Sequence, residues 1–318
     1  MTFQFQRALR TETSLLIGIA GASGSGKTFS ALRLATGLAG DGKIGFIDTE
    51  AGRALHYADK FNFDHGELKP PFTPEAYTDA ISSYEKAGYK VIIIDSMSHE
   101  HEGEGGLLEW AERLSETVKP PKNWTKPKMA HKRMVNKMLQ NHAHLIFCLR
   151  AEDKIKITKD KDGKMVIIKA EDIAPRDRWV PICEKRFMYE MTVSMVMTPD
   201  NPGVPIPIKI QDQHRFAFPQ GQVVDEDAGR KLAEWAKGKT LPGATNPTGM
   251  SGNGAGEKSP LSLTGAVPPS FETDEDLLAE ARKQGEHGEL IFMRWLRSLA
   301  KADQSTVATI SADIKARW

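Results

Sequence analysis

The segment Gly21–Thr28 has the residue types and spacing to bind a nucleoside triphosphate. It fits the pattern G-x-x-x-x-G-K-[ST] completely. Glycines let the backbone wrap around phosphates, and loop N–H groups followed by a helix N-terminus favour negative charge. Lys27 can reach the terminal phosphates, and the Thr28 hydroxyl can ligate Mg²⁺. The expected cofactors are therefore ATP and Mg²⁺, and the expected nucleotide contacts are Gly21, Ala22, Ser23, Gly24, Ser25, Gly26, Lys27, Thr28 and Phe29. The competing interpretation is a glycine-rich turn that binds nothing.

An acid at the end of an apolar strand completes the expected magnesium site. Val91–Asp95 reads Val-Ile-Ile-Ile-Asp, a buried strand that ends in a carboxylate. Beside a phosphate loop, such a carboxylate holds a water-coordinated Mg²⁺. We therefore expect Thr28 and Asp95 to hold the metal together. The alternative is a buried strand with an ordinary terminal aspartate.

A hydrolase also needs a group that orients the attacking water. Asp48-Thr-Glu50 follows a second apolar run, Lys43–Asp48, and Glu50 is the candidate for that role. The alternative is a solvated acid at a strand end.

These motifs together resemble those of RecA-type recombinases. Phe46–Glu50 is similar to the segment that ends in their catalytic glutamate, and Ile94-Asp-Ser96 is similar to the end of their Walker B strand. The closer resemblance, over residues 14 to 237, is to the small RecA-like phage proteins of the Sak group, which bind ATP and are implicated in single-strand annealing and recombination. In that sheet order Glu50 and Asp95 emerge at the same edge.

One position departs from the recombinase pattern. Recombinases of this type place a glutamine at the end of the strand after Walker B, where this chain has Leu149-Arg150. Arg150 is therefore either a catalytic sensor of the γ-phosphate or a residue that faces solvent.

A basic segment lies where RecA-like proteins carry a DNA-contacting loop. Between Lys119 and Lys137 there are seven cations, no acids and one tryptophan. Cations that neutralise phosphates and an aromatic ring that stacks on a base suit single-stranded DNA. The candidate contacts are Trp124, Lys126, Lys128, Lys132 and Arg133. The alternative is a solvated amphipathic helix with a packed tryptophan.

A hairpin over residues 154–169 is the second DNA candidate. Ile155 and Ile157 precede Asp162-Gly163, a turn signal, and an exposed β-ribbon is the alternative. Its DNA candidates are Lys156, Lys159 and Lys161. Further along, Lys185 and Arg186 are candidates for a cation that completes the ATP site of a neighbouring subunit, with a surface ion pair as the alternative.

The elements that must position these residues alternate between strands and helices, which predicts an α/β fold with a mainly parallel sheet. A helix is expected over Thr28–Ala39, ending at Gly40. The expected strands are Leu15–Ala20, Lys43–Asp48, Val91–Asp95, His144–Leu149, Thr192–Met197 and Ile206–Ile210.

Three regions are expected along the 318 residues. They are a RecA-like ATPase core at 1–237, a Gly/Pro/Ser-rich linker at 238–272 and a small helical unit at 273–318. The apolar stripe of the last unit, which includes Leu290 and Trp295, is too large for so short a piece to bury alone. The stripe either packs on the ATPase core or contacts a partner such as a single-strand-binding protein or a neighbouring subunit, and we expect a partner because the linker suits a tethered module.

Charge, cysteine content and apolar runs further limit the kinds of protein that this sequence can be. The formal net charge is +1, so a nucleic-acid surface must come from local clustering. Two cysteines, Cys148 and Cys183, are too few for a disulfide framework and fit a reducing cytoplasm, that of the bacterial host if the protein is phage-encoded. No apolar run is long enough to span a membrane. His99-Glu-His-Glu102 follows the Val91–Asp95 strand, where a loop is expected, and a dedicated transition-metal site there is disfavoured.

The sequence therefore predicts an Mg²⁺-dependent ATPase that binds single-stranded DNA, promotes annealing or strand exchange and assembles as a homo-oligomer. Three alternatives stay open: an AAA-type helicase loader or motor, a small-molecule kinase, and an ATP-gated DNA-binding scaffold without turnover. The AAA-type motor is disfavoured because its catalytic acid usually follows the Walker B aspartate directly, where this chain has Ser96.

Overall fold

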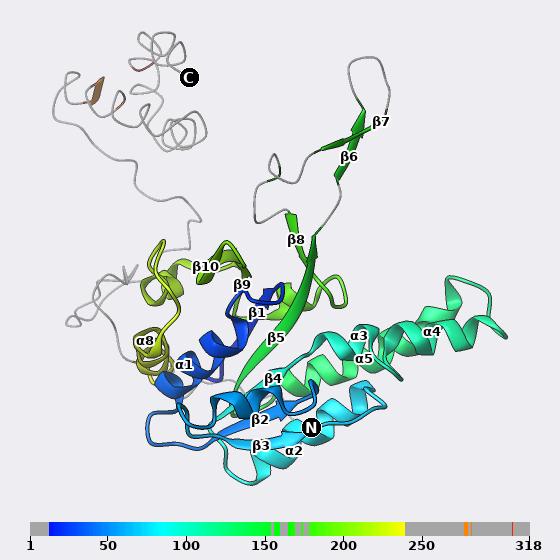
Figure 1. Ribbon diagram of the computed structural model, residues 1–318, viewed down its shortest axis with the longest axis horizontal. Coiled ribbons are helices and arrows are strands. Elements are labelled where there is room, and N and C mark those ends of the chain that lie inside the picture. Colours follow the sequence, from blue (N-terminus) through cyan, green and yellow to red (C-terminus); the bar gives the residue numbers. More distant parts are fainter. Residues whose placement is uncertain are drawn as a thin grey trace, which may run out of the picture. The chain divides into compact units, whose positions relative to one another are not determined.

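The computed structural model describes residues 13–153, 156–159, 165–168, 173 and 178–238, together with residues 277, 278, 281 and 307. Strands and helices alternate along the chain (Figure 1). The strands are β1 (Leu16–Gly21), β2 (Ile44–Asp48), β3 (Asp64–Glu67), β4 (Val91–Asp95), β5 (His144–Asp153), β6 (Lys156–Lys159), β7 (Met165–Ile168), β8 (Trp179–Pro181), β9 (Val193–Thr198) and β10 (Asn201–Lys209). The α-helices are α1 (Lys27–Ala39), α2 (Pro74–Lys86), α3 (Ser98–Glu102), α4 (Leu107–Ser115), α5 (Thr125–Leu139), α7 (Phe187–Glu190) and α8 (Glu226–Ala236), and the 3₁₀ helices are η1 (Arg53–Tyr57), η2 (Lys122–Trp124) and η4 (Asp212–Ala217).

The main sheet has the strand order β10-β9-β1-β5-β4-β2-β3, with β8 paired to the far end of β5. The strands from β9 to β3 in this order run parallel, and β10 is antiparallel to β9. The register sets Gly21 of β1 opposite Arg150 of β5, and Asp48 of β2 opposite Asp95 of β4. The sheet order therefore brings the predicted phosphate loop and both predicted acid segments to one edge.

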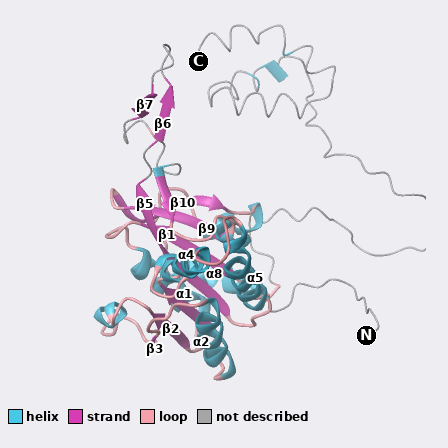
Figure 2. Ribbon diagram, turned by 90° about the vertical axis from the view of Figure 1, so that its right-hand side faces the viewer, coloured by secondary structure: helices cyan, strands magenta, loops and turns pink. Residues whose placement is uncertain are grey.

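The strands are apolar on both faces because helices cover both faces, as Figure 2 shows. Along β4, Val91 and Ile93 pack with the core that includes α1 and α8, whereas Ile92 and Ile94 pack with the core that includes α2 and α5. This alternation follows from the two-residue period of a strand. The central strands are thus held rigidly from both sides, and the loops at their ends are positioned accordingly.

The α/β fold with a mainly parallel sheet, predicted from the sequence, is confirmed. The six predicted strands correspond to β1, β2, β4, β5, β9 and β10, and the predicted helix corresponds to α1. Two strands of the main sheet, β3 and β8, were not predicted. The hairpin signal at 154–169 corresponds to β6 and β7, which pair antiparallel in a sheet of their own.

Several expectations concern residues that the structure does not describe. The chain separates into two compact units, Met1–Thr248 and Gly249–Trp318. Residues 239–272 and nearly all of the expected C-terminal unit lie outside the described residues, so the linker and helical unit stay predictions. Cys148 and Cys183 are both free thiols. Within the described part of the chain, no helix is long and apolar enough to cross a membrane.

Candidate nucleotide-binding and catalytic site

The loop between β1 and α1 forms an anion cradle. Gly24 and Gly26 adopt φ values of 79° and 84°, the left-handed region that glycine tolerates best. The N-terminus of α1 has neither a side-chain cap nor an acidic residue in its first turn, so its N–H groups are left to a ligand. A Cβ added at Gly26 would lie 2.9 Å from the backbone nitrogen of Gly203, which itself donates to the Ser25 carbonyl at 2.9 Å. The loop is therefore built from backbone groups and is braced by β10.

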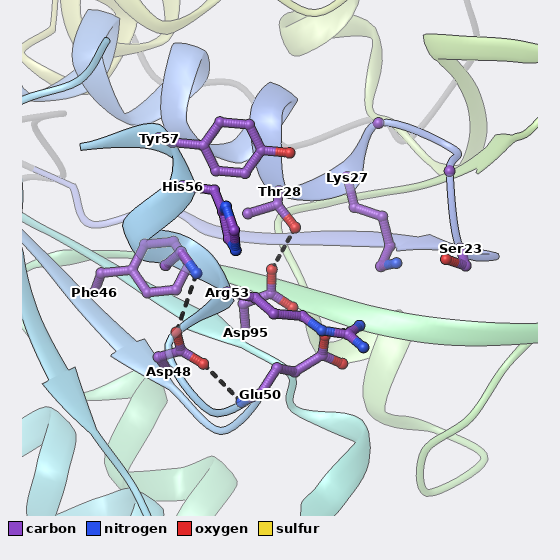
Figure 3. Close-up of a pocket in the computed structure, with 13 residues that line it drawn as sticks. Ser23, Lys27, Thr28, Phe46, Asp48, Glu50, Arg53, His56, Tyr57 and Asp95 are labelled. Carbon is purple, nitrogen blue, oxygen red and sulfur yellow. Dashed lines mark hydrogen bonds and ion pairs between the residues drawn. The ribbon is translucent and has the colours of Figure 1, made fainter. Parts of the chain in front are cut away.

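The metal-binding candidates meet beside this loop. The Thr28 hydroxyl donates to Asp95 Oδ2 at 2.6 Å (Figure 3). Asp95 is buried, and its burial raises the pKa of its carboxyl to about 6, against the opposing effects of the Thr28 hydrogen bond and the Lys27 charge. A hydroxyl and a carboxylate are the hard oxygen donors that Mg²⁺ prefers. The residues present therefore fit a magnesium ion held by Thr28 and Asp95.

Lys27 stays within the phosphate loop. Its Nζ lies 3.4 Å from the carbonyl oxygen of Ala22, and the side chain lines the same cavity as Thr28 and Asp95. When a nucleotide binds, the Lys27 ammonium can exchange its contact with the Ala22 carbonyl for one with a phosphate oxygen.

Asp48 holds the turn that carries Glu50. Its side chain is buried, and it accepts hydrogen bonds from the backbone nitrogens of Glu50 at 2.6 Å and Ala54 at 3.1 Å. The Nε2 atom of His65, on β3, lies 3.1 Å from Asp48 Oδ2. Asp48 is thus a structural acid that shapes the β2–η1 turn, and Glu50 is the acid that the turn presents to the cavity.

Glu50 is bracketed by two arginines. Arg150 Nε and Nη2 lie 2.9 and 2.8 Å from Glu50 Oε1, and Arg53 Nη1 lies 3.2 Å from Oε2. Arg150 also approaches Glu102 Oε1, at 3.9 Å. Arg150 is thus paired with the predicted catalytic acid while its side chain stays 42% exposed, so its role as a sensor remains a prediction.

A cavity of about 430 Å³ joins these groups. The phosphate loop, Glu50 and Asp95 line one part, and the turn and helix η1 after Glu50 line another (Figure 3). Sequence reasoning missed this second wall, whose residues are Phe46, Arg53, Ala54, His56 and Tyr57. The only signal was a tyrosine seven residues after Glu50, too common a feature to single out. Aromatic rings beside a phosphate cradle offer a flat surface for a nucleobase.

Not every predicted nucleotide contact lines this cavity. Ser23, Gly24, Gly26, Lys27 and Thr28 do. Phe29 supports the wall instead, because its ring packs against those of Tyr57 and Phe61, with ring centres 5.9 and 5.4 Å apart. The remaining three predicted contacts, which lie in the loop but not in the lining, are Gly21, Ala22 and Ser25.

The DNA candidates lie on other elements. Trp124 is half-buried at the start of α5, with Lys128 Nζ 5.8 Å from its ring centre. The four cationic DNA candidates on α5 are exposed: Lys126, Lys128, Lys132 and Arg133. Lys128 and Lys132 line one hollow together with Lys185 and Arg186, which precede α7. Lys156 and Lys159 lie on β6, but their side chains, like Lys161 as a whole, are outside the described residues.

The segment His99–Glu102 corrects one expectation. It forms the short helix α3 with Ser98 and is not a loop, because residues after β4 turn directly into helical backbone. Glu100 is buried and pairs with His131 of α5, Oε1 to Nδ1, at 3.0 Å. Among the described residues, no three His, Cys, Asp or Glu side chains are grouped so that they could hold a metal ion.

Comparison with known proteins identifies the family. None of the curated proteins matches the chain. A family model described as an AAA domain matches residues 13–194, which is more than half of the chain and includes the phosphate loop, Glu50, Asp95 and Arg150. The chain therefore belongs to the AAA domain family of P-loop ATPases.

Proposed function

We propose that this protein is an Mg²⁺-dependent ATPase that binds single-stranded DNA and promotes annealing or strand exchange, as expected for the Sak-type group. The observation that carries the ATPase part is the convergence of Lys27, Thr28, Glu50 and Asp95 on one cavity. Each of these side chains has a distinct role in phosphoryl transfer to water.

The roles follow from position. Backbone N–H groups of the loop and the N-terminus of α1 bind the phosphates, and Lys27 lies against the terminal ones. Thr28 and Asp95 hold Mg²⁺, which neutralises charge on the phosphate oxygens when bound. Glu50 accepts a hydrogen bond from the attacking water and orients it. Arg150, which pairs with Glu50, contacts the γ-phosphate and stabilises the charge that it gains.

The wall formed by His56 and Tyr57 suits the base and ribose of the nucleotide. Both side chains line the cavity at the part opposite Lys27 and Ser23 (Figure 3). A ring that already packs on Phe29 is held in place and loses little freedom when it stacks on a base. We therefore assign the adenine to this wall.

The DNA part rests on the cations of α5 and on Trp124. Seven cations without an acid between residues 119 and 137 give this segment a local positive charge that the net charge of +1 conceals. Homo-oligomerisation, a cytoplasmic location and recruitment of a single-strand-binding protein by residues 273–318 complete the proposal.

A second candidate function is an ATP-gated scaffold that binds nucleotide without turnover. The specific observation in its favour is that both carboxylate oxygens of Glu50 are within ion-pair distance of an arginine. In such a scaffold, Glu50 would stay paired and no group would orient water.

One experiment separates these functions. ATP turnover and particle size are measured together on the full chain, with and without single-stranded DNA. Turnover that rises with DNA and is absent in Lys27→Ala supports the ATPase, and ATP affinity without turnover selects the scaffold. Phosphate transfer to a small molecule would instead select a kinase.

A further inference from the structure

A second hollow, of about 480 Å³, lies between α5 and the segment that leads into α7. The α5 side is lined by Lys128, His131, Lys132 and Val135. Their spacing of three, four and seven residues places them on one face of the helix. The other side is lined by Glu184, Lys185, Arg186, Phe187 and Glu190. We call this hollow the α5–α7 groove.

The floor of the groove is apolar and aromatic. Phe187 is only 1% exposed, and its ring packs edge-on against Phe147, with ring centres 5.3 Å apart. The His131 ring packs against Phe187 at 5.8 Å, and the buried carboxylate of Glu100 fixes its orientation. Val135 completes the floor. Only small parts of these side chains reach the groove, because His131 and Val135 are each 7% exposed. The floor is therefore a narrow apolar surface that can contact part of a base but offers no open ring face for a full stack.

The rim carries four exposed cations: Lys128, Lys132, Lys185 and Arg186. None of the four forms an ion pair with another residue in the part of the chain that the structure describes. Glu184 accepts a hydrogen bond from the backbone of Arg186 at 2.7 Å, and Glu190 is the second acid on the rim. The rim therefore has an excess of positive charge above an apolar floor.

A smaller hollow of about 270 Å³ adjoins the groove. It is lined by Trp124, His101 and Leu107, and it shares Lys128, Glu184 and Lys185 with the groove. The shared cations lie between the two hollows. This order of apolar floor, cation and aromatic ring matches the alternation of base and phosphate along a single strand.

We propose that the α5–α7 groove holds one unstacked nucleotide of a single strand, with its base inserted against the narrow apolar floor, its phosphates on the cationic rim, and the next base against Trp124. This inference rests on the proposed binding of single-stranded DNA, and it adds which residues form the binding site. It also reassigns Lys185 and Arg186, which contact the strand rather than the ATP site of a neighbouring subunit.

The helix α5 offers a matched pair of variants. Lys128 and Lys132 line the groove, whereas Lys126 and Arg133 are exposed on the same helix but do not. Lys128→Gln/Lys132→Gln and Lys126→Gln/Arg133→Gln therefore remove the same charge from the same element. Binding of the full-length protein to a labelled dT oligonucleotide is measured by fluorescence anisotropy over a range of salt concentrations.

We expect the groove pair to weaken binding about tenfold or more and to reduce the log–log salt slope by about 0.7 for each lost contact. The Lys126→Gln/Arg133→Gln variant should change the affinity and the salt slope by less than half as much. Glu190→Gln, which removes an acid from the rim, should tighten binding. An oligonucleotide with an abasic residue at its centre should bind more weakly than dT.

Each contrary result has a defined meaning. Equal losses of affinity in the two double variants would overturn the groove as the binding site and indicate a general cationic surface on α5. The proposed function would then stand. Equal affinity for the abasic and intact strands, or equally strong competition by poly-glutamate, would overturn the assignment to a base. If the unmodified protein does not bind single strands at all, the proposed function fails and the groove fails with it.

Discussion

Arg150 of β5 reaches across the end of β4 to Glu50, and its Nε and Nη2 lie 2.9 and 2.8 Å from Glu50 Oε1. Glu50 lies in the turn after β2, and β4 with Asp95 lies between β2 and β5. The predicted base and the predicted sensor are therefore paired across the strand that carries the predicted metal ligand. A γ-phosphate that attracts Arg150 would free Glu50 Oε1 for a water molecule.

Glu50→Gln tests the assignment of the base. The substitution keeps the shape and the hydrogen-bonding capacity of the side chain but removes its basicity, so we expect ATP binding to be retained and turnover to fall by about 10²-fold or more. Single-turnover hydrolysis and nucleotide titration measure the two effects separately. Turnover at the wild-type rate would move the base elsewhere, and Glu102, which approaches Arg150 at 3.9 Å, would be the next candidate.

Arg150→Ala tests whether the arginine positions Glu50. Without Arg150, Glu50 keeps only the contact of its Oε2 with the exposed Arg53, so Oε1 is no longer held in place. We therefore expect lower turnover in a single-turnover assay. Arg150→Lys keeps the charge but loses the two-nitrogen contact, so it should restore only part of the rate. Wild-type turnover in Arg150→Ala would contradict the positioning role.

Asp95 should leave a signature in the stability of the nucleotide-free protein. Its folded pKa of about 6 lies above the ordinary value of 3.8, so the folded state binds the proton more tightly than the unfolded state does. The contribution of this group to the free energy of unfolding is therefore largest at low pH and declines as the pH rises from about 4 to about 6. Urea unfolding of the wild type and of Asp95→Asn across this range isolates the effect. A constant difference between the two proteins would contradict the raised pKa.

Much of the site was predictable from sequence because its parts lie at strand ends. The runs Ile44–Asp48 and Val91–Asp95 are buried on both faces, so their apolar patterns are continuous, and the acids mark where each strand ends. The strand β3 was not predictable, because Asp64–Glu67 has no apolar residue and exists through its pairing with β2. The pairs Glu50–Arg150 and Glu100–His131 join residues far apart in sequence, and no local pattern links them.

Removal of residues 240–318 tests the expected three-part organisation. Because all of the cavity residues lie before residue 96, we expect basal ATP turnover to remain nearly unchanged. Annealing, or stimulation by a single-strand-binding protein, should be impaired because a tethered module supplies effective concentration. Turnover and annealing assays on the truncated chain measure both. An insoluble product, or loss of ATP binding, would show that the apolar stripe around Trp295 belongs to the core.

Glu100→Gln tests whether the groove and the ATP site communicate through α3. In this helix, Glu100 pairs with His131 of the groove floor. Ser98 Oγ accepts a hydrogen bond from the backbone N–H of Arg150 at 2.9 Å. His99 Nδ1 lies 2.7 Å from Oγ1 of Thr49, the residue before Glu50. Three adjacent residues thus touch the groove floor, the sensor strand and the turn that carries the base.

Glu100→Gln keeps an oxygen for His131 but removes the charge that orients it. We expect basal turnover and fold to be retained while stimulation by single-stranded DNA falls severalfold, and the exposed Glu104→Gln on the same segment should behave as wild type. Full stimulation in Glu100→Gln would mean that the strand acts on the ATP site by another route.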